Sequence, residues 1–390
     1  MITEANVTLG SYGAGAKPVI QHTSGIGIRH NQAAPKNNLT IDGFKVDGDG
    51  TGTQGIVLEG GTGHSLSNLI IGNNTAQGIR GNQGPTFTLD GFSISDVGDD
   101  GIITFGGFPT IRNGSILAIN TTNPTSGTGD CIQLSNTGFS ITDYLIEHVR
   151  GVHRSSDKGA VFVDEVGSIG GTIRFCDFTA ENLGISSRDL TGNVHDNIVR
   201  SAAVGYVSAV DSSTIKFWNN VTLDCAVGAS AKNTSSTYTI YNNAFLNCTN
   251  HALDSNTTNT CTVLWRNNLC SMGTISGGDD YVIHVGANVT YTANNNLYQS
   301  IGDGWRSDAT VETTLAAWQT TSGETNSIAL VDPQLAGPDY FTEFSSRAFR
   351  AGANVSGFHG TVDQFMDIPS IGRDDAGLSM QRRRVRVRNR

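Results

Sequence analysis

The sequence contains few of the residues that build most globular cores. Aromatic residues account for 7% of the 390 positions and charged residues for 15%. This composition suits a stacked interior of small and β-branched side chains better than a helical core. No stretch reaches the roughly 20 apolar residues that cross a bilayer. A P-loop, a dinucleotide-binding glycine fingerprint and His/Cys zinc spacings are also missing. These absences predict no membrane insertion and exclude the nucleotide and zinc sites that short motifs encode.

Charge and cysteine content narrow the choice further. The formal net charge is −10, which argues against general binding to nucleic acid or other polyanions. The last ten residues, QRRRVRVRNR, are a basic exception, and we expect residues 381–390 to form a solvated tail. Six Cys in a chain this long do not predict a disulfide framework. Cys225 and Cys248 stand at equivalent positions of a repeat, so we expect small interior side chains there, with a bridge left open.

What the sequence does contain is a repeat, clearest between residues 213 and 248. The segments STIKFWNN and STYTIYNN each lead to an Asn pair, and Asn220 and Asn243 are 23 residues apart. A period of this length with short strands and Gly/Asn corners predicts a solenoid in which each repeat forms one coil. Such a corner needs positive φ or a side chain that bonds its own backbone, and stacked Asn side chains can form an amide ladder. The predicted corner series is Gly43, Asn68, Gly91, Gly114, Tyr144, Asp177, Asn197, Asn220, Asn243, Asn268 and Asn296.

These repeats resemble the right-handed parallel β-helices of the pectate-lyase-like superfamily, whose coils carry similar Asn ladders. The resemblance covers about residues 6 to 300 and implies an all-β, right-handed parallel β-helix of about ten or eleven coils. The superfamily includes lyases, hydrolases, phage tailspikes and structural coils, so the resemblance is specific for fold and weak for function.

The domain boundaries follow from where the repeat stops. We expect the β-helix to span residues 1–300 and a C-terminal capping segment to span residues 301–380, with a short amphipathic helix within residues 311–324. The first residues already read as strands of a coil. An open solenoid end exposes strand edges, so we expect a missing N-terminal segment or another chain, as in a homo-oligomer or larger assembly, to cover this end.

A second strand follows each corner, and its side chains alternate between the interior and the outer surface. The second and fourth residues of each strand should face inward, and the third and fifth should form the outer face of one parallel sheet. Identical positions on adjacent coils then lie about 4.8 Å apart. The predicted first residues are Gly55, Gly78, Gly101, Cys131, Ala160, Gly184, Gly205, Gly228, His251 and Tyr281.

Two acidic residues are the first catalytic candidates. Asp100 and Asp130 each precede a strand on adjacent coils, so their backbones should lie about 5 Å apart. Two carboxylates this close raise one another's pKa, which suits a general acid beside a nucleophile or base in glycoside hydrolysis. The segment GDCIQL also resembles the Asp-Asp-Cys-Ile segment of polygalacturonase-type hydrolases, with Gly129 in place of the first Asp. The alternative is that both carboxylates cap backbone N–H groups at the corner.

A second candidate set combines acidic and basic residues on the outer face. Asp164 and Arg188 share the fifth strand position, and Lys158 and His153 come from the adjoining loop, where His153 is a predicted substrate contact. In uronate β-elimination a base removes the C5 proton and a cation neutralises the carboxylate, roles that Lys and Arg fill in several β-helix lyase families. The alternative is an exposed Asp164–Arg188 pair worth less than about 1 kcal/mol. Either carboxylate set could hold Ca²⁺; no other cofactor and no dedicated metal site are predicted.

These residues predict a glycan-binding groove. The long loops 120–130 and 150–159 should wall one side of it. The expected function is an extracellular polysaccharide lyase or glycoside hydrolase; the alternative is a non-catalytic virion spike or adhesion protein that uses the helix as a rigid glycan-binding rod. Either role places the protein outside the cell or on a virion surface, with a polysaccharide as its partner. The residues predicted to floor the groove are Gln133, Phe162, Asp164, Ser186 and Arg188.

Overall fold

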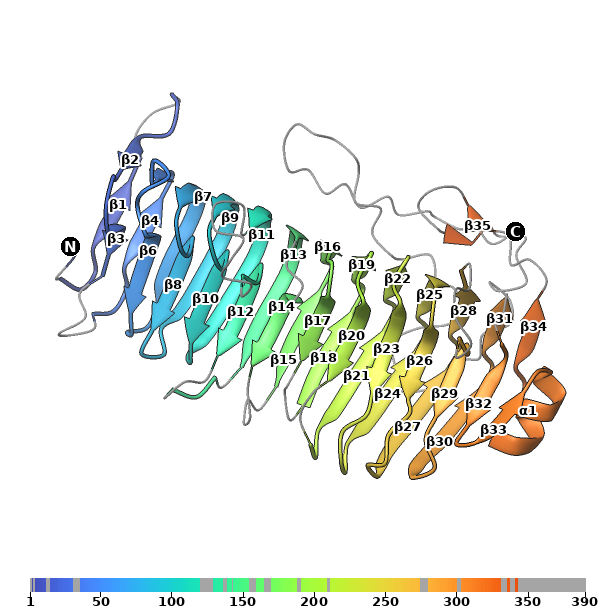
Figure 1. Ribbon diagram of the computed structural model, residues 1–390. Helices are drawn as coiled ribbons and strands as arrows, with labels where there is room; N and C mark the ends of the chain where they lie inside the picture. Colours follow the sequence, from blue (N-terminus) through green and yellow to red (C-terminus); the bar gives the residue numbers. More distant parts are fainter. Residues whose placement is uncertain are drawn as a thin grey trace, which may run out of the picture.

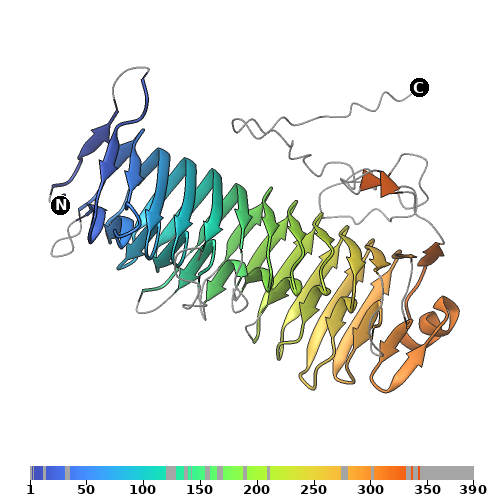
Figure 2. The ribbon, with the colours of Figure 1, turned by 45° about the horizontal axis from the view of Figure 1, so that its top comes forward.

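The computed structural model shows parallel strands stacked along one long axis from the N-terminal to the C-terminal coil (Figure 1). The expected all-β, right-handed parallel β-helix is confirmed. Each coil passes through three faces, two of which share one long strand in four of the coils, and the view in Figure 2 shows the same regular stack from another side. The structure describes residues 2, 4–11, 15–30, 36–119, 129–135, 139–141, 143–153, 159–164, 170–187, 191–208, 211–273, 280–299, 303–330, 335–336 and 341–342.

Faces 1 and 2 meet at the corner predicted from the Asn pairs. In the first half of the stack, four long strands run through this corner and belong to both faces: β7 (His64–Asn74), β9 (Thr86–Val97), β11 (Phe108–Ile119) and β13 (Tyr144–Val152). The other strands of face 1 are β1 (Thr8–Gly10), β4 (Thr40–Asp42), β15 (Gly171–Arg174), β18 (Thr191–His195), β21 (Thr214–Trp218), β24 (Thr237–Tyr241), β27 (Cys261–Arg266) and β30 (Val289–Asn294). The other strands of face 2 are β2 (Val19–Gln21), β5 (Lys45–Asp47), β16 (Asp177–Thr179), β19 (Ile198–Arg200), β22 (Val221–Leu223), β25 (Ala244–Cys248), β28 (Leu269–Met272), β31 (Leu297–Gln299) and β34 (Ile328–Leu330).

Face 3 is the sheet formed by the strands that follow each corner. Its parallel strands are β3 (Ile26–Arg29), β6 (Gln54–Glu59), β8 (Ile79–Asn82), β10 (Ile102–Phe105), β12 (Ile132–Ser135), β14 (Gly159–Asp164), β17 (Leu183–Ser187), β20 (Val204–Ser208), β23 (Val227–Ala231), β26 (His251–Ser255), β29 (Ile283–Val285) and β32 (Trp305–Ser307). An antiparallel strand, β33 (Thr310–Glu312), pairs with β32. The described part of face 3 therefore contains twelve parallel strands, in keeping with the predicted solenoid of about ten or eleven coils.

Alternation along the strands fills the interior. The inward residues of β6, Ile56 and Leu58, are fully buried, and the same holds for Ile132 and Leu134 of β12. Burying such side chains is the main stabilising contribution, at about 25 cal/mol per Å² of apolar surface. All six cysteines are free and buried. The expectation of interior side chains at Cys225 and Cys248 is thus confirmed, and the bridge that was left open is not formed.

The amide ladder is also confirmed. The Nδ2 group of each Asn donates to Oδ1 of the Asn on the next coil, over 3.1, 3.1, 3.0 and 3.4 Å. The residue before each ladder Asn has positive φ, for example 54° at Asn219 and 56° at Asn242, and it is Asn in every case except Asp196, which precedes Asn197. The two residues at each corner therefore have different roles: the first turns the chain, and the second joins neighbouring coils by hydrogen bonds. The ladder residues are Asn197, Asn220, Asn243, Asn268 and Asn296.

The predicted corner series does not keep one register. Tyr144 is buried inside strand β13, and the turn of its coil lies at His148, which has φ of 55°. Gly114 is in register with the ladder Asn residues and follows the turn at Asn113, whereas Asp177 lies one position after the ladder register and Gly43, Asn68 and Gly91 lie one position before it. Coils with long excursions do not keep the 23-residue spacing, so counting from one corner to the next misses the turn.

A short helix stands at the far end of the stack (Figure 1). Helix α1 (Leu315–Ser322) begins at the N-cap Thr314, whose side chain accepts from the Ala317 N–H, and it ends at Gly323 with φ of 71°. Its fully buried Trp318 stacks on Trp305 of the last coil at 6.5 Å. This confirms the predicted helix within residues 311–324. Strands β35 (Leu335–Ala336) and β36 (Phe341–Thr342) form a separate pair; the rest of the predicted cap after residue 330 and the basic tail at 381–390 lie outside the described residues. Among the described helices, none has the length and apolarity needed to cross a membrane.

Candidate functional site

One outward-pointing residue of each face 3 strand occupies the same register position, and these residues form one row along the stack, called the outer row below. Strand pairing places the predicted floor residues Gln133, Phe162 and Ser186 in it, on three successive coils. All three are at least nine-tenths buried, with exposures of 7%, 7% and 1%. Neighbouring members lie about 4.8 Å apart, as adjacent parallel strands do. The row comprises Arg29, Val57, Arg80, Ile103, Gln133, Phe162, Ser186, Val207, Ser230, Asp254, His284 and Arg306.

The structure brings Asp100 and Asp130 together at the start of β10 and β12. Asp100 Oδ1 accepts the backbone N–H of Asp130 at 2.9 Å, and Asp130 Oδ1 accepts that of Gly159 at 2.8 Å. Their exposures are 2% and 0%. This is the corner-capping arrangement that the sequence left open, since each carboxylate ties its coil to the next one. Burial, followed by the charges of both Asp residues, raises the pKa of the neighbouring Cys131 thiol.

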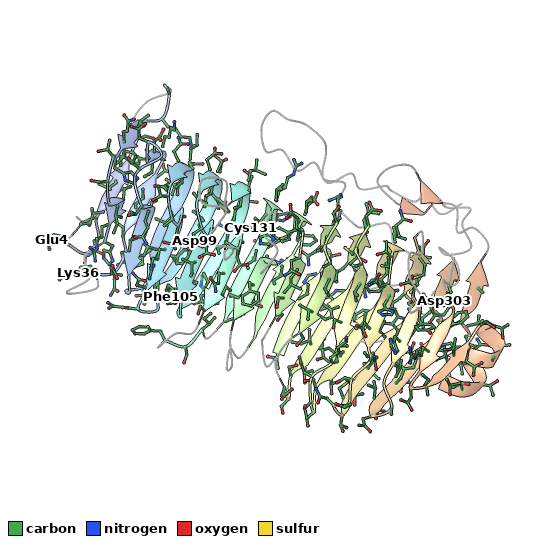
Figure 3. The ribbon with its side chains drawn as sticks, viewed as in Figure 1. Glu4, Lys36, Asp99, Phe105, Cys131 and Asp303 are labelled. Atoms are coloured by element: carbon green, nitrogen blue, oxygen red, sulfur yellow. The ribbon has the colours of Figure 1, made fainter. Side chains whose placement is uncertain are left out.

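Polar side chains also occupy this corner on the coils before Asp100, toward the N-terminus. Gln54 Nε2 donates to Gln77 Oε1 at 2.8 Å, and Gln77 Nε2 donates to Asp99 Oδ2 at 2.7 Å. Figure 3 marks Asp99 and Cys131 on adjacent coils of this region. Side-chain hydrogen bonds that connect one coil to the next therefore recur along this corner, and they stabilise the stack in the way the Asn ladder does.

His153, the predicted substrate contact at the end of β13, is 1% exposed. Burial lowers the pKa of its imidazole to about 4, so the ring is neutral at physiological pH. Its backbone N–H donates to the Thr179 carbonyl at 2.8 Å. A neutral imidazole this deep has to become accessible before it can contact a polymer.

The remaining predicted residues are not described at side-chain level. Lys158 and Arg188 lie outside the described residues, and only the backbone of Asp164 is described, where it pairs with Ser135. Their roles in elimination, as base, cation and acidic partner, stay predictions.

Sequence reasoning missed a group of titratable residues on β26 and β29. The predicted first residues His251 and Tyr281 are wrong by one position, because His251 pairs with Val227 while Leu253 pairs with Ala229. The turn after Cys248 holds one more residue than the turn after Cys225. In a strand, a shift by one residue exchanges the inner and outer faces. Asp254 and His284 consequently lie in the outer row; the missing Gly at the start of HALDS was the available signal.

This group is strongly charged. Lys232 Nζ lies 2.5 Å from Asp254 Oδ2, and the Arg306 guanidinium lies 5.4 Å from the centroid of the Tyr281 ring. Burial, followed by the neighbouring His251, lowers the pKa of His284 to about 4. This part of face 3 thus presents a neutral imidazole, a carboxylate and two cations on four successive coils.

Comparison with family models and with curated proteins finds no match. Among solved structures, the chain is similar to "The complex structure of XylC with xylose", with 12% sequence identity and a TM-score of 0.34. The match covers 71% of this chain and 53% of the other, so this chain spans about half the length of that structure. A likeness this low does not bear on substrate or activity.

Proposed function

We propose that the protein binds and processes a linear polysaccharide along the outer surface of face 3. The observation that carries this proposal is the outer row, in which outward side chains repeat at the strand spacing of about 4.8 Å on a rigid sheet. A polymer that lies along the row can reach its half-buried members, such as Val207, Ser230 and Asp254 on three successive coils, while buried members such as Gln133 and Ser186 have to become accessible first. We further propose that the protein works outside the cell or on a virion surface, where such polymers occur.

The chemistry of cleavage depends on which residues reach the polymer. Hydrolysis needs Asp100 or Asp130 at the substrate, and both carboxylates are buried and accept backbone N–H groups. β-Elimination instead relies on Lys158 and Arg188, with Asp164 nearby, as base and cation. The bonding of the two Asp residues therefore favours elimination as the proposed reaction.

A second candidate function is non-catalytic glycan binding by a rigid rod. The observation that favours it is the same pair of hydrogen bonds, since it assigns Asp100 and Asp130 to holding the coils together. A spike or adhesion protein needs only the outer row and a stiff scaffold.

The experiment incubates the full chain with a panel of uronic-acid and neutral polysaccharides. Ultraviolet absorbance reports unsaturated ends from elimination, and a reducing-end assay reports hydrolysis. Elimination predicts that Lys158→Ala or Arg188→Ala abolishes turnover while Asp130→Asn retains it; hydrolysis predicts the reverse. Phe162→Ala should weaken binding in either case, whereas Lys216→Ala on face 1 serves as the control. Binding without turnover supports the rod function, and no binding to any glycan contradicts both.

A further inference from the structure

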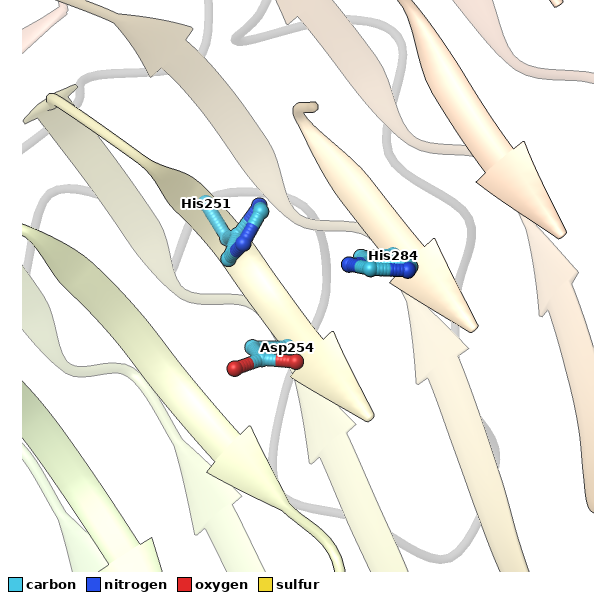
Figure 4. A group of neighbouring side chains, drawn as sticks. All are labelled: His251, Asp254 and His284. Atoms are coloured by element: carbon cyan, nitrogen blue, oxygen red, sulfur yellow. The ribbon is translucent and has the colours of Figure 1, made fainter. Parts of the chain in front are cut away.

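His251, Asp254 and His284 gather on the outer surface of face 3, five to six coils beyond Asp130. Figure 4 shows two of the side chains on β26 and the third on the adjacent strand β29. Each can offer one ligand atom, and these atoms all lie within 4.8 Å of one another. The centroids of the two imidazole rings are 5.3 Å apart. Two imidazoles and a carboxylate are a ligand set that divalent transition metals bind in proteins.

The orientation of His251 suits a ligand. Its Nδ1 lies 2.9 Å from the Tyr281 carbonyl oxygen. A carbonyl only accepts, so Nδ1 carries the proton and Nε2 keeps its lone pair. Metal-binding histidines commonly donate their second ring N–H to a carbonyl in this way, which fixes the tautomer and the ring orientation. His251 Nε2 is therefore available as a metal ligand in this structure.

The Asp254 carboxylate already has two contacts but can still bind a metal ion. Asp254 Oδ2 lies beside Lys232 Nζ at 2.5 Å, and Oδ1 accepts the Asn256 N–H at 3.1 Å. An ionised carboxylate has about four lone-pair positions, so two contacts leave room for a metal bond. Lys232 and the nearby Arg306 nevertheless repel a cation, which limits the affinity of the site.

A second histidine pair in the molecule shows what distinguishes this group. The rings of His30 and His64 are 5.0 Å apart. Backbone groups occupy both nitrogens of His64, since Nδ1 accepts the Leu39 N–H at 3.3 Å and Nε2 lies 2.8 Å from the Gly60 carbonyl. Nε2 of His30 accepts the Lys36 N–H at 3.3 Å. That pair serves the backbone, and it belongs to no cluster of three ligands among the described residues.

We infer that His251, Asp254 and His284 bind a divalent transition-metal ion, Zn²⁺, with a water completing the coordination. Zn–N and Zn–O bonds of about 2.0–2.2 Å place the ligands of a tetrahedral site about 3.4 Å apart, so the side chains turn inward by about 1 Å on binding. The inference does not rest on the proposed function, because the metal is measured with no glycan present.

The experiment titrates the chelator-treated full chain with ZnCl₂ at neutral pH by calorimetry and with CoCl₂ by visible absorption. We expect one equivalent to bind and the cobalt spectrum to show the intense bands of four-coordinate Co²⁺. His284→Ala and the near-isosteric Asp254→Asn should each weaken binding at least about tenfold. Lys232→Gln should strengthen it several-fold, because it removes a competing cation.

His195→Ala is the matched control. His195 Nδ1 lies 2.6 Å from Asp196 Oδ2, a His–Asp pair that belongs to no cluster of three ligands in the described chain. Its substitution should leave zinc affinity unchanged. Circular dichroism of each variant checks that the coils stay folded. The inference is overturned if the native chain binds no zinc at millimolar concentration, or if His284→Ala and Asp254→Asn bind as tightly as the native chain while folded.

Discussion

The corner between faces 1 and 2 is built in two ways along the same molecule. In the first half of the stack, register-equivalent positions hold Leu69, Phe92, Gly114 and Val149, and the Phe92 ring fills the space where a side chain of Gly114 would stand. In the second half the same column holds the ladder from Asn197 to Asn296. One column is apolar, while the other is polar and joined by hydrogen bonds from coil to coil.

The difference changes the strands themselves. Asn243 Oδ1 accepts the Asn220 backbone N–H at 3.0 Å, so a side chain takes the place of the neighbouring strand at this point. The pairing breaks there, and each coil has two short strands. Where the column is apolar, β7 and β9 run through the corner over 11 and 12 residues. A buried corner therefore tolerates either solution, provided that every backbone group keeps a partner.

The largest effect should come from breaking the polar column. Asn243→Leu removes the acceptor of the Asn220 N–H and the donor to the Phe217 carbonyl, which lies 3.1 Å away. Leaving such groups buried and unpaired should lower the free energy of unfolding by about 3 kcal/mol. Chemical denaturation measures it. Asn247→Gly is the control, because Asn247 is exposed and Gly accepts its φ of 54°. An unchanged midpoint for Asn243→Leu would contradict the ladder's role.

Acid should act on buried histidines and spare the ladder, which contains no titratable group. The pKa of buried His153 is lowered to about 4, while an unfolded His has a pKa near 6.5. Below about pH 6.5 the unfolded chain gains a proton that the folded chain does not, so stability falls as the pH drops toward 4. Between pH 7.5 and pH 5 His153 should contribute a loss of about 2 kcal/mol. Chemical denaturation at both pH values should show a smaller change in the free energy of unfolding for His153→Asn than for the native chain. An equal change would contradict the assignment of this pH dependence to His153.

Placing an amide side chain in the apolar column should lower the free energy of unfolding by somewhat less than the two preceding changes. Val149 is fully buried, and its neighbours in the column are Gly114 and Cys176. Val149→Asn buries an amide with no ladder partner, which should destabilise by about 1–2 kcal/mol. Val149→Ala measures the part that is due to lost volume. Equal effects of the two variants would show that the corner supplies partners for the amide.

Much of this contrast could be predicted from the sequence. The Asn residues that recur every 23 to 28 positions predicted the ladder, and strand alternation placed Gln133, Phe162 and Ser186 in one row. Register failed where a coil changed length, at Tyr144 and at His251, because a solenoid conserves the stack and not the count of residues. The role of Asp100 and Asp130 stayed undecided for another reason. At a corner a carboxylate can point to solvent or to the next coil's backbone, and residue type does not distinguish the two.

The smallest effect should come from lengthening the ladder by one coil. Cys176 stands directly before Asn197 in the column, and its backbone N–H already donates to Asn197 Oδ1 at 3.0 Å. Its Sγ lies 3.8 Å from the Ile146 carbonyl, which is the register equivalent of the Ile173 carbonyl that Asn197 Nδ2 reaches at 2.9 Å.

Cys176→Asn should therefore find an acceptor in the Ile146 carbonyl and another in Asn197, and stability should stay within about 0.5 kcal/mol of the native chain. The same substitution one coil earlier, Val149→Asn, is costly because it lacks these partners. In the Cys176→Asn background, Val149→Asn should lower the free energy of unfolding by a smaller amount, because the two amide side chains can then stack. A double-mutant cycle on denaturation midpoints measures this coupling. Additive effects, or a Cys176→Asn loss as large as that of Val149→Asn, would show that the border between the two columns is not set by neighbouring partners.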